Sequence, residues 1–298
     1  MDTLMSLFQN EIKIAMSISK ASTVITGDNV YQEGDKNIIP LLAEMIDSVM
    51  LPGSGVDGME HLEDLLAKAE SGKSCLLLLE HYSNFDLTLF YRLVQRAGDR
   101  GNAIAEALIA IAGMKLNEDN PIVAAFASAY TRIVIYPSRS LHGLDAETKK
   151  VELARSFAIN RAAMKTLDQI KTQGRLILVF PAGTRYRPWD PSTKKGVREI
   201  DSYIRSFDYM CFVALNGELL HVQQTDMLND IVTRDIMRVT AGPVQSCAEF
   251  HSRVRAAADA AGIEDKKQAV VDAIMAELER LHIEADKRRQ SLLAGSPA

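Results

Sequence analysis

Between residues 59 and 180, short apolar runs alternate with helix-length amphipathic segments, and this alternation limits the possible folds more than any other feature of the chain. The apolar runs lie at 75–80, 105–112, 132–136 and 175–180, and the amphipathic segments lie at 59–70, 86–96, 120–129 and 148–172. Apolar runs without polar alternation are typical of strands that are buried on both faces. The pattern therefore predicts an α/β fold, in which a mostly parallel mixed sheet carries helices on both faces.

The parts of the chain outside this region are predicted to be mostly helical. Residues 3–20 and 40–50 each place apolar side chains on one helical face, and the glycine-rich loop LPGSGVDG follows them. We therefore expect a small helical N-terminal unit over residues 1–57 and an α/β domain, including C-terminal helices, over residues 58–298. Additional strands are expected within 209–222 and 236–244, and helices within 246–293.

The composition is that of an ordinary globular chain, with 47% hydrophobic and 24% charged residues. No stretch reaches the roughly 18 uninterrupted apolar residues of a membrane-spanning helix, and the N-terminus lacks the pattern of a signal peptide. The cysteines Cys75, Cys211 and Cys247 are isolated and show no metal-ligand spacing. We therefore expect a cytoplasmic protein without a bound metal, while peripheral contact with the inner face of a membrane stays open.

Positive charge is concentrated in one part of an otherwise acidic chain. The net charge is −5, yet residues 131–200 contain 14 Lys and Arg against 6 Asp and Glu. Such a local field favours an anionic partner, for example a phosphate, coenzyme A or an acidic carrier protein. Some of these cations, including Arg155 and Arg161, fall on the predicted helix 148–172 and are expected to form its solvated face.

The most chemically informative residues follow the first apolar run. The segment LLLLEHYSNFD places His81 at the end of the predicted strand and Asp86 at the start of the next helix. A carboxylate on one ring nitrogen fixes the tautomer of an imidazole, and the other nitrogen can then take a proton from a hydroxyl. His221 and Asp226 have the same spacing but neither the preceding strand nor the following helix. His81 is therefore a candidate general base that Asp86 orients; a structural loop histidine is the alternative.

A second informative segment, RLILVFPAGTRYRP, follows about a hundred residues later. An apolar run ends here in a Pro and Gly turn, and Arg185 and Arg187 come directly after the turn. A turn at a strand end exposes backbone N–H groups, and the forked guanidinium donors suit phosphate oxygens. The segment therefore predicts an anion site, and a solvated basic loop is the alternative reading.

Taken together, the two motifs resemble those of the phospholipid and glycerol acyltransferase superfamily. In that superfamily a strand ends in H-x4-D and a later strand ends in F-P-x-G-T-R, and the likeness covers about residues 58–245. The soluble, plastid-type glycerol-3-phosphate acyltransferases are most similar, because this chain keeps the Pro, the Gly, the paired arginines and the final Pro of their P-S-G-G-R-x-R-P motif. Many lysophosphatidate acyltransferases carry a glutamate where this chain has Ala182.

The resemblance implies a reaction and a set of site residues. His81, oriented by Asp86, would take the proton from the sn-1 hydroxyl of glycerol 3-phosphate as it attacks an acyl thioester of acyl carrier protein or coenzyme A. The phosphate would be held by the paired arginines and by a third segment, TRIVIYPSRSLH. The implied phosphate ligands are Arg185, Arg187 and, from the third segment, Arg139, or His142 if that loop is longer by two residues. The candidate oxyanion donors are the backbone N–H groups of the turn at Gly183 and Thr184. The reaction needs no cofactor, no metal and no nucleic-acid partner.

The acyl chain of such a substrate needs an apolar groove. The small side chains of 104–114 and 121–130 could line one beside His81, although a buried strand and helix would have the same composition.

Three other functions fit parts of the sequence. One is acyl transfer to lysophosphatidate or another hydroxyl, and one is lipid or phosphate binding without catalysis. The third is nucleotide binding through AKAESGKS at 67–74, but a phosphate-binding loop joins a strand to a following helix, and here a helix comes first.

Overall fold

A nine-stranded mixed sheet forms the centre of the computed structural model, which describes residues 1–20, 22, 24–118 and 120–295. Its strands run in the order β1-β5-β4-β6-β3-β7-β10-β2, with β11 paired to β7, and most of the pairs are parallel. The strands are β1 (Tyr31–Gln32), β2 (Gly55–Asp57), β3 (Cys75–Leu79), β4 (Leu108–Gly113), β5 (Arg132–Ile135), β6 (Leu176–Val179), β7 (Tyr209–Asn216), β10 (Arg238–Ala241) and β11 (Gln245–Ser246). The predicted α/β class is confirmed.

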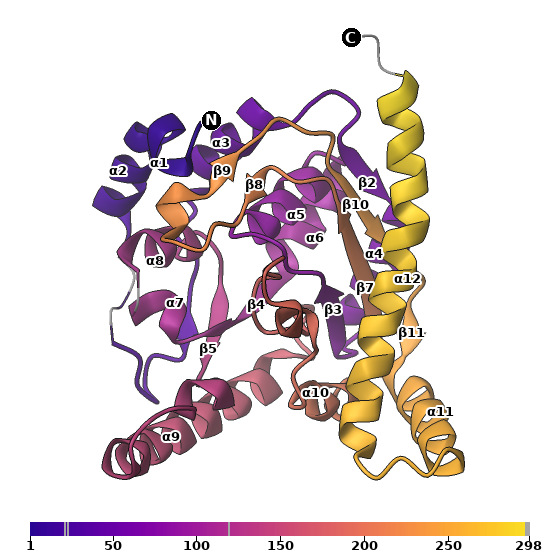
Figure 1. The fold of residues 1–298 in the computed structure, drawn as a ribbon. Helices are drawn as coiled ribbons and strands as arrows, with labels where there is room; N and C mark the ends of the chain where they lie inside the picture. The colour runs from indigo at the N-terminus through magenta and orange to yellow at the C-terminus, as the bar shows by residue number, and fades with distance from the viewer. Residues whose placement is uncertain (21, 23, 119, 296–298) are drawn as a thin grey trace.

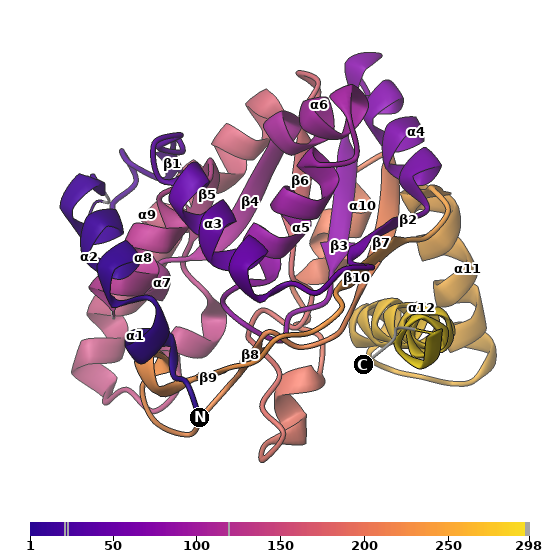
Figure 2. The same cartoon turned by 90° about the horizontal axis from the view of Figure 1, so that it is seen from above.

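Helices cover both faces of this sheet (Figures 1 and 2). One face carries α1 (Leu4–Leu7), α2 (Gln9–Ile18), α3 (Ile39–Val49), α4 (Met59–Glu70), α5 (Asp86–Gln95), α6 (Asp99–Ala107) and α8 (Pro121–Ala127). The other carries α9 (Ala146–Ile170), α10 (Ile200–Ser206), α11 (Cys247–Ala260) and α12 (Lys266–Gly295). Two short strands, β8 (Leu220–His221) and β9 (Ile231–Val232), pair with each other outside the main sheet.

The central strand β3 shows why its sequence is apolar throughout. Successive side chains of a strand point to opposite faces. Leu77 and Leu79 accordingly lie in the core beneath α4 and α5, whereas Leu76 and Leu78 lie in the core beneath α9 and α12. Every residue of β3 is buried, so a polar residue at any of these positions would lack a solvated side.

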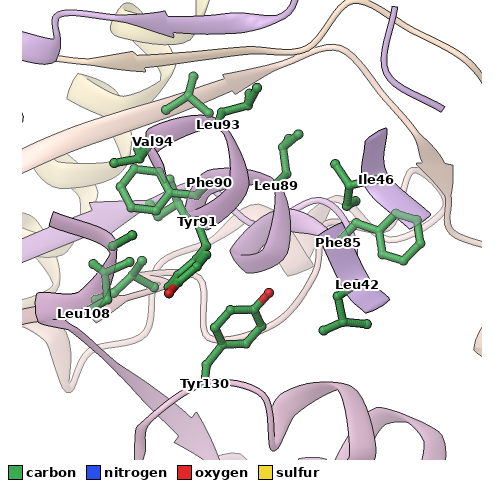
Figure 3. Packing of buried hydrophobic residues seen from close by; sticks show 14 of the residues in the cluster. Leu42, Ile46, Phe85, Leu89, Phe90, Tyr91, Leu93, Val94, Leu108 and Tyr130 are labelled. Atoms are coloured by element: carbon green, nitrogen blue, oxygen red, sulfur yellow. The ribbon is translucent and has the colours of Figure 1, made fainter. Parts of the chain in front are cut away.

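The segment before residue 58 is helical in large part but also contributes to the sheet. Its strands β1 and β2 form the two outer edges, where β1 pairs antiparallel with β5 and β2 pairs parallel with β10. Side chains of α2 and α3 join the same core as α5, and Figure 3 shows Leu42 and Ile46 of α3 beside Phe85 and Leu89. Because both edge strands are only two or three residues long, they leave little unpaired backbone for association with another sheet.

Three boundaries differ from the sequence prediction. Residues 105–107, expected at the start of a strand, form the last turn of α6, and the chain enters β4 directly at Leu108 without a turn residue to mark the change. The predicted helix 3–20 is divided at Phe8 into α1 and α2, and the C-terminal helical region is divided near Gly262 into α11 and α12. The apolar stripe of Val270, Ile274 and Leu278 on α12 is buried against the sheet.

The structure also bears on the other predicted features of the chain. AKAESGKS joins the end of α4 to the start of β3, so its order is opposite to that of a phosphate-binding loop. Within the described residues, no helix is both long and apolar enough to cross a membrane.

The contact between α5 and α6 makes a prediction about stability. A Cβ atom on Gly101 would lie 2.0 Å from the carbonyl oxygen of Val94, so the two helices approach as closely as a glycine allows. Gly101→Ala should lower the free energy of unfolding by about 1–3 kcal/mol, measured by denaturant unfolding. Gly27→Ala is the matched control, since its new methyl group would have ordinary 3.5 Å contacts. Equal stability of the two variants would contradict this packing.

Candidate active site

The two main motifs meet at one edge of the sheet because they follow neighbouring parallel strands. β3 pairs with β6 in parallel register, with Leu78 opposite Val179, so both strands end at the same level. His81 follows the end of β3, and the turn that begins at Phe180 follows the end of β6. Functional loops are expected at the carboxyl ends of strands in such sheets, and the structure places both motifs there.

His81 and Asp86 form the dyad that the sequence suggests. The Nδ1 atom of His81 lies 2.9 Å from Oδ2 of Asp86, which is the first residue of α5 and is only 4% exposed. An ionised carboxylate can only accept a hydrogen bond, so the pairing places the imidazole proton on Nδ1. Nε2 has no hydrogen-bond partner among the described residues and is the nitrogen that could take a proton from a substrate.

Asp86 is itself held in place by the loop that precedes it. Its carboxylate accepts hydrogen bonds from the backbone N–H groups of Tyr82 and Ser83 and from the Ser83 hydroxyl, which lies 2.9 Å from Oδ1. With the bond from His81, four donors satisfy one buried carboxylate, which offsets the cost of burying its charge. The loop conformation and the orientation of His81 therefore depend on the same side chain.

The second motif contacts the first directly. The ring of Phe180 stacks on His81 with 4.1 Å between ring centroids, and the Tyr186 N–H donates to the His81 carbonyl at 2.8 Å. Gly183 has a φ of +61°, which suits glycine, and its N–H donates to the Phe180 carbonyl within the turn. The N–H of Gly183 is therefore already used, whereas that of Thr184 makes no hydrogen bond to the described residues.

The four expected phosphate ligands lie in three different environments. Arg139 is placed against the turn, since its Nη2 would lie 3.3 Å from a Cβ on Gly183. Partial burial, followed by the charge of nearby Arg187, lowers the pKa of Arg139, and Glu199 acts in the opposite direction. The guanidinium groups of Arg139 and Arg187 form no hydrogen bond or ion pair with the described part of the chain. Both therefore keep N–H donors for an anion.

Arg185 and His142 are placed differently. Nη1 of Arg185 lies 3.2 Å from Oδ2 of Asp230, a fully buried carboxylate whose other oxygen accepts the Gln223 N–H. The charge of Arg185 is therefore already balanced within the protein. His142 follows the short 3-10 helix η1 (Ser138–Leu141) and is exposed, and the structure gives its side chain no contact with the other site residues.

An apolar cavity of about 100 Å³ adjoins His81. Both segments that the sequence suggested contribute to it, Ala110 and Ala112 from β4 and Phe126 and Tyr130 from the α8 region. Both segments therefore contribute to a cavity beside His81, and the four side chains named here are at the same time buried in the strand and helix region. A buried arginine, Arg132, also lies in its wall, and burial lowers the pKa of this guanidinium to about 10.

A larger cavity and a buried polar network were not found from sequence. The cavity has about 590 Å³ and is lined by aromatic and polar side chains, among them Tyr82, Tyr186, Trp189, Glu218 and His221. His221 belongs to the pair that sequence reasoning set aside, and it forms an ion pair with Glu218 at 3.0 Å instead of contacting Asp226. The only sequence signal for this region was its polar loop composition.

The buried network connects α12 to the loop that carries His81. Glu80 is 7% exposed, accepts a hydrogen bond from the Tyr82 hydroxyl at 2.8 Å and from the Leu215 N–H, and pairs with Nδ1 of His282 at 2.9 Å. His282 is 200 residues away in sequence from Tyr82, so no local pattern could have found it. The only sequence signal for this network was Glu80, a charged residue that directly follows the apolar strand β3.

The chain has no match among protein-family models, and a search of the curated proteins finds no relative. Within the described residues, no three His, Cys, Asp or Glu side chains form a group that could hold a metal ion.

The ion pair between Glu80 and His282 predicts a pH-dependent stability. Burial by itself lowers the pKa of His282, but the hydrogen bond and charge of Glu80, with Glu279, outweigh burial and the opposing charge of Lys194, and the net pKa is raised above 6.5. A histidine with a raised pKa in the folded state stabilises the protein below its ordinary pKa, and this contribution is lost as pH rises through the folded value.

We therefore expect His282→Gln to lower the melting temperature most below pH 6.5, by about 2–4 °C for each kcal/mol lost, and less in alkaline buffer. Thermal unfolding across this range measures the difference. His61→Gln, on α4, is the control. If the variant and the unmodified chain differed in melting temperature by the same amount at all pH values, His282 would act through packing alone.

Proposed function

We propose that this protein transfers a fatty acyl group from an acyl thioester to the sn-1 hydroxyl of glycerol 3-phosphate. The observation that carries the proposal is the position of the His81 and Asp86 dyad. An apolar cavity adjoins it, and two guanidinium groups that are unpaired within the described residues lie near the adjoining turn. A general base beside both a hydrocarbon site and a phosphate site suits acyl transfer to a phosphorylated alcohol. The resemblance of the two motifs to the acyltransferase superfamily supports the same reaction.

The residues of the site account for the steps of this reaction. Nε2 of His81 takes the proton of the attacking hydroxyl while its oxygen forms a bond to the thioester carbon. The tetrahedral oxyanion accepts a hydrogen bond from the N–H of Thr184. When the intermediate collapses, the carbon–sulfur bond breaks and the imidazolium returns its proton to the thiolate. Asp86 stabilises the imidazolium throughout, so the chain supplies a base without a covalent intermediate on the protein.

The arginines determine which acceptor fits. A phosphate monoester carries between one and two negative charges near neutral pH, and Arg139 and Arg187 offer two cations that no described carboxylate neutralises by direct contact. A phosphate held there is close to the base, because the turn that Arg139 contacts begins at Phe180, and Phe180 stacks on His81. Arg185, which is neutralised by Asp230, fixes the loop and adds donors instead of net charge.

Turnover by the purified protein tests the reaction itself. We expect lysophosphatidate from glycerol 3-phosphate with palmitoyl or oleoyl thioesters, detected by mass spectrometry, and a loss of at least about 100-fold in kcat for His81→Ala. The His61→Ala variant, on α4, should keep the activity of the unmodified chain. Product from lysophosphatidate alone would move the assignment to that acceptor. Binding of lipid without turnover, unaffected by His81→Ala, would support a binding protein instead.

A comparison of arginine variants tests the acceptor site. Arg139→Ala and Arg187→Ala should raise the Michaelis constant for glycerol 3-phosphate about 10- to 100-fold, as expected for the loss of a charged hydrogen bond. Arg185→Ala should have a smaller effect on this constant and a larger one on stability, because it leaves Asp230 buried without its cation. Arg161→Ala, an exposed cation on α9, is the control. Unchanged Michaelis constants in the first two variants would remove these arginines from the site.

A further inference from the structure

The apolar cavity beside His81 ends at a second, smaller cavity. The second cavity has about 50 Å³, and the two share three lining residues, Leu87, Ala110 and Tyr130. These residues come from α5, β4 and the connection between α8 and β5, so they form a partition that separates the two spaces. Of these two cavities, only the first has His81 in its wall.

The second cavity opens toward the surface of the protein. Its other lining residues include Gly34, Lys36 and Glu106. The side chains of Lys36 and Glu106 are 79% and 54% exposed, and they lie 3.9 Å apart. A hydrocarbon chain that entered beside His81 and passed the partition would therefore reach solvent between two charged side chains.

Tyr130 provides much of the bulk of this partition. Ala110 has a small side chain, and Leu87 directly follows the dyad residue Asp86 in α5. Tyr130 is therefore the only aromatic side chain among the three shared residues. The centroid of its ring lies 5.3 Å from that of the Tyr91 ring, and Figure 3 shows the two rings facing each other. Tyr91 lines the second cavity but not the first. Tyr130 is 7% exposed, and burial raises the pKa of its hydroxyl while Thr88 acts in the opposite direction.

We propose that Tyr130 sets the length of the acyl chain that the site accepts. The proposal rests on the acyl-transfer function proposed above and names a residue that determines its donor specificity. Carbon atoms between the thioester and Tyr130 lie in the first cavity and are buried. Longer chains meet the ring of Tyr130, so further methylene groups add no buried surface and no affinity unless the ring moves. Replacing the ring joins the two cavities and lets the chain continue toward Lys36 and Glu106.

The dependence of binding on chain length tests this proposal. Each buried methylene group increases affinity roughly fourfold, so affinity should rise along a series of saturated S-alkyl coenzyme A thioethers and then level off where the chain reaches Tyr130. These unreactive analogues, from octyl to octadecyl, can be titrated by calorimetry. In Tyr130→Ala the rise should continue over at least two more methylene groups, a gain of about 16-fold or more for the longer chains.

Two further variants serve as controls, and a third covers loss of folding. The break point is the chain length at which affinity stops rising. Tyr130→Phe keeps the ring and should keep the original break point. Tyr91→Ala enlarges only the second cavity and should also keep it. Tyr130→Leu removes part of the ring but retains an apolar side chain, and it should move the break point in the same direction if the alanine variant does not fold.

The outcomes separate this inference from the proposed function. An unchanged break point in Tyr130→Ala and Tyr130→Leu, with normal turnover, would overturn the assignment of Tyr130 and leave the acyltransferase function standing. Absence of turnover with every thioester would overturn the function, and the binding series would still decide whether Tyr130 limits the cavity. A shifted break point, together with a matching shift in the preferred thioester, would support both.

Discussion

The complete burial of β3 on both faces is the constraint on which the rest of the structure depends. Its alternate side chains belong to two separate cores, so α4 and α5 must cover one face while α9 and α12 cover the other. Its position between β6 and β7 also fixes where the chain leaves the sheet. His81 is therefore held at a rigid strand end next to the end of β6, which is where a catalytic loop can be positioned accurately.

Two buried carboxylates, Glu80 and Asp86, lie in the segment that follows β3. Each of them holds a different part of the molecule in place. Asp86 collects four hydrogen bonds from residues 81–83 and so determines both the loop and the tautomer of His81. Glu80 points its charge toward Tyr82, β7 and His282, which ties the C-terminal helix α12 to the same loop. A charge buried without such partners would be costly, so the C-terminal helix supports the geometry of the dyad although it contributes no residue to it.

The arginines of the second motif illustrate how tertiary contacts divide apparently equivalent residues. Arg185 and Arg187 are separated by one residue, yet Arg185 pairs with a buried aspartate from a distant loop and Arg187 has no such partner among the described residues. Arg139 lies in η1, which follows β5, the strand two positions from β6 in the sheet, and it lies beside the same turn as Arg187. The pair that offers free positive charge is thus formed from two segments, not from the R-x-R motif alone.

Much of the architecture could be predicted from the sequence because it depends on local periodicity. The apolar runs correctly indicated β3, β5 and β6, and the 3.6-residue pattern indicated α4, α5 and α9. The strand β4 was predicted to begin three residues too early, since α6 runs into it without a turn residue and Ala and Ile suit both structures. The edge strands β1 and β2 are too short to carry a pattern, and only their pairing with β5 and β10 defines them.

The same division applies to the candidate site. The sequence by itself determined the spacing of His81 and Asp86, their place at a strand end, and the small side chains that line the cavity beside them. Only the tertiary structure decided that Asp230 neutralises Arg185, that His282 reaches Glu80 from α12, and that Tyr130 divides two cavities. The physical reason is the separation of the interacting residues along the sequence. The features in the first set depend on residues within one turn or strand. Those in the second set depend on contacts between distant segments, which only the packed sheet and helices bring together.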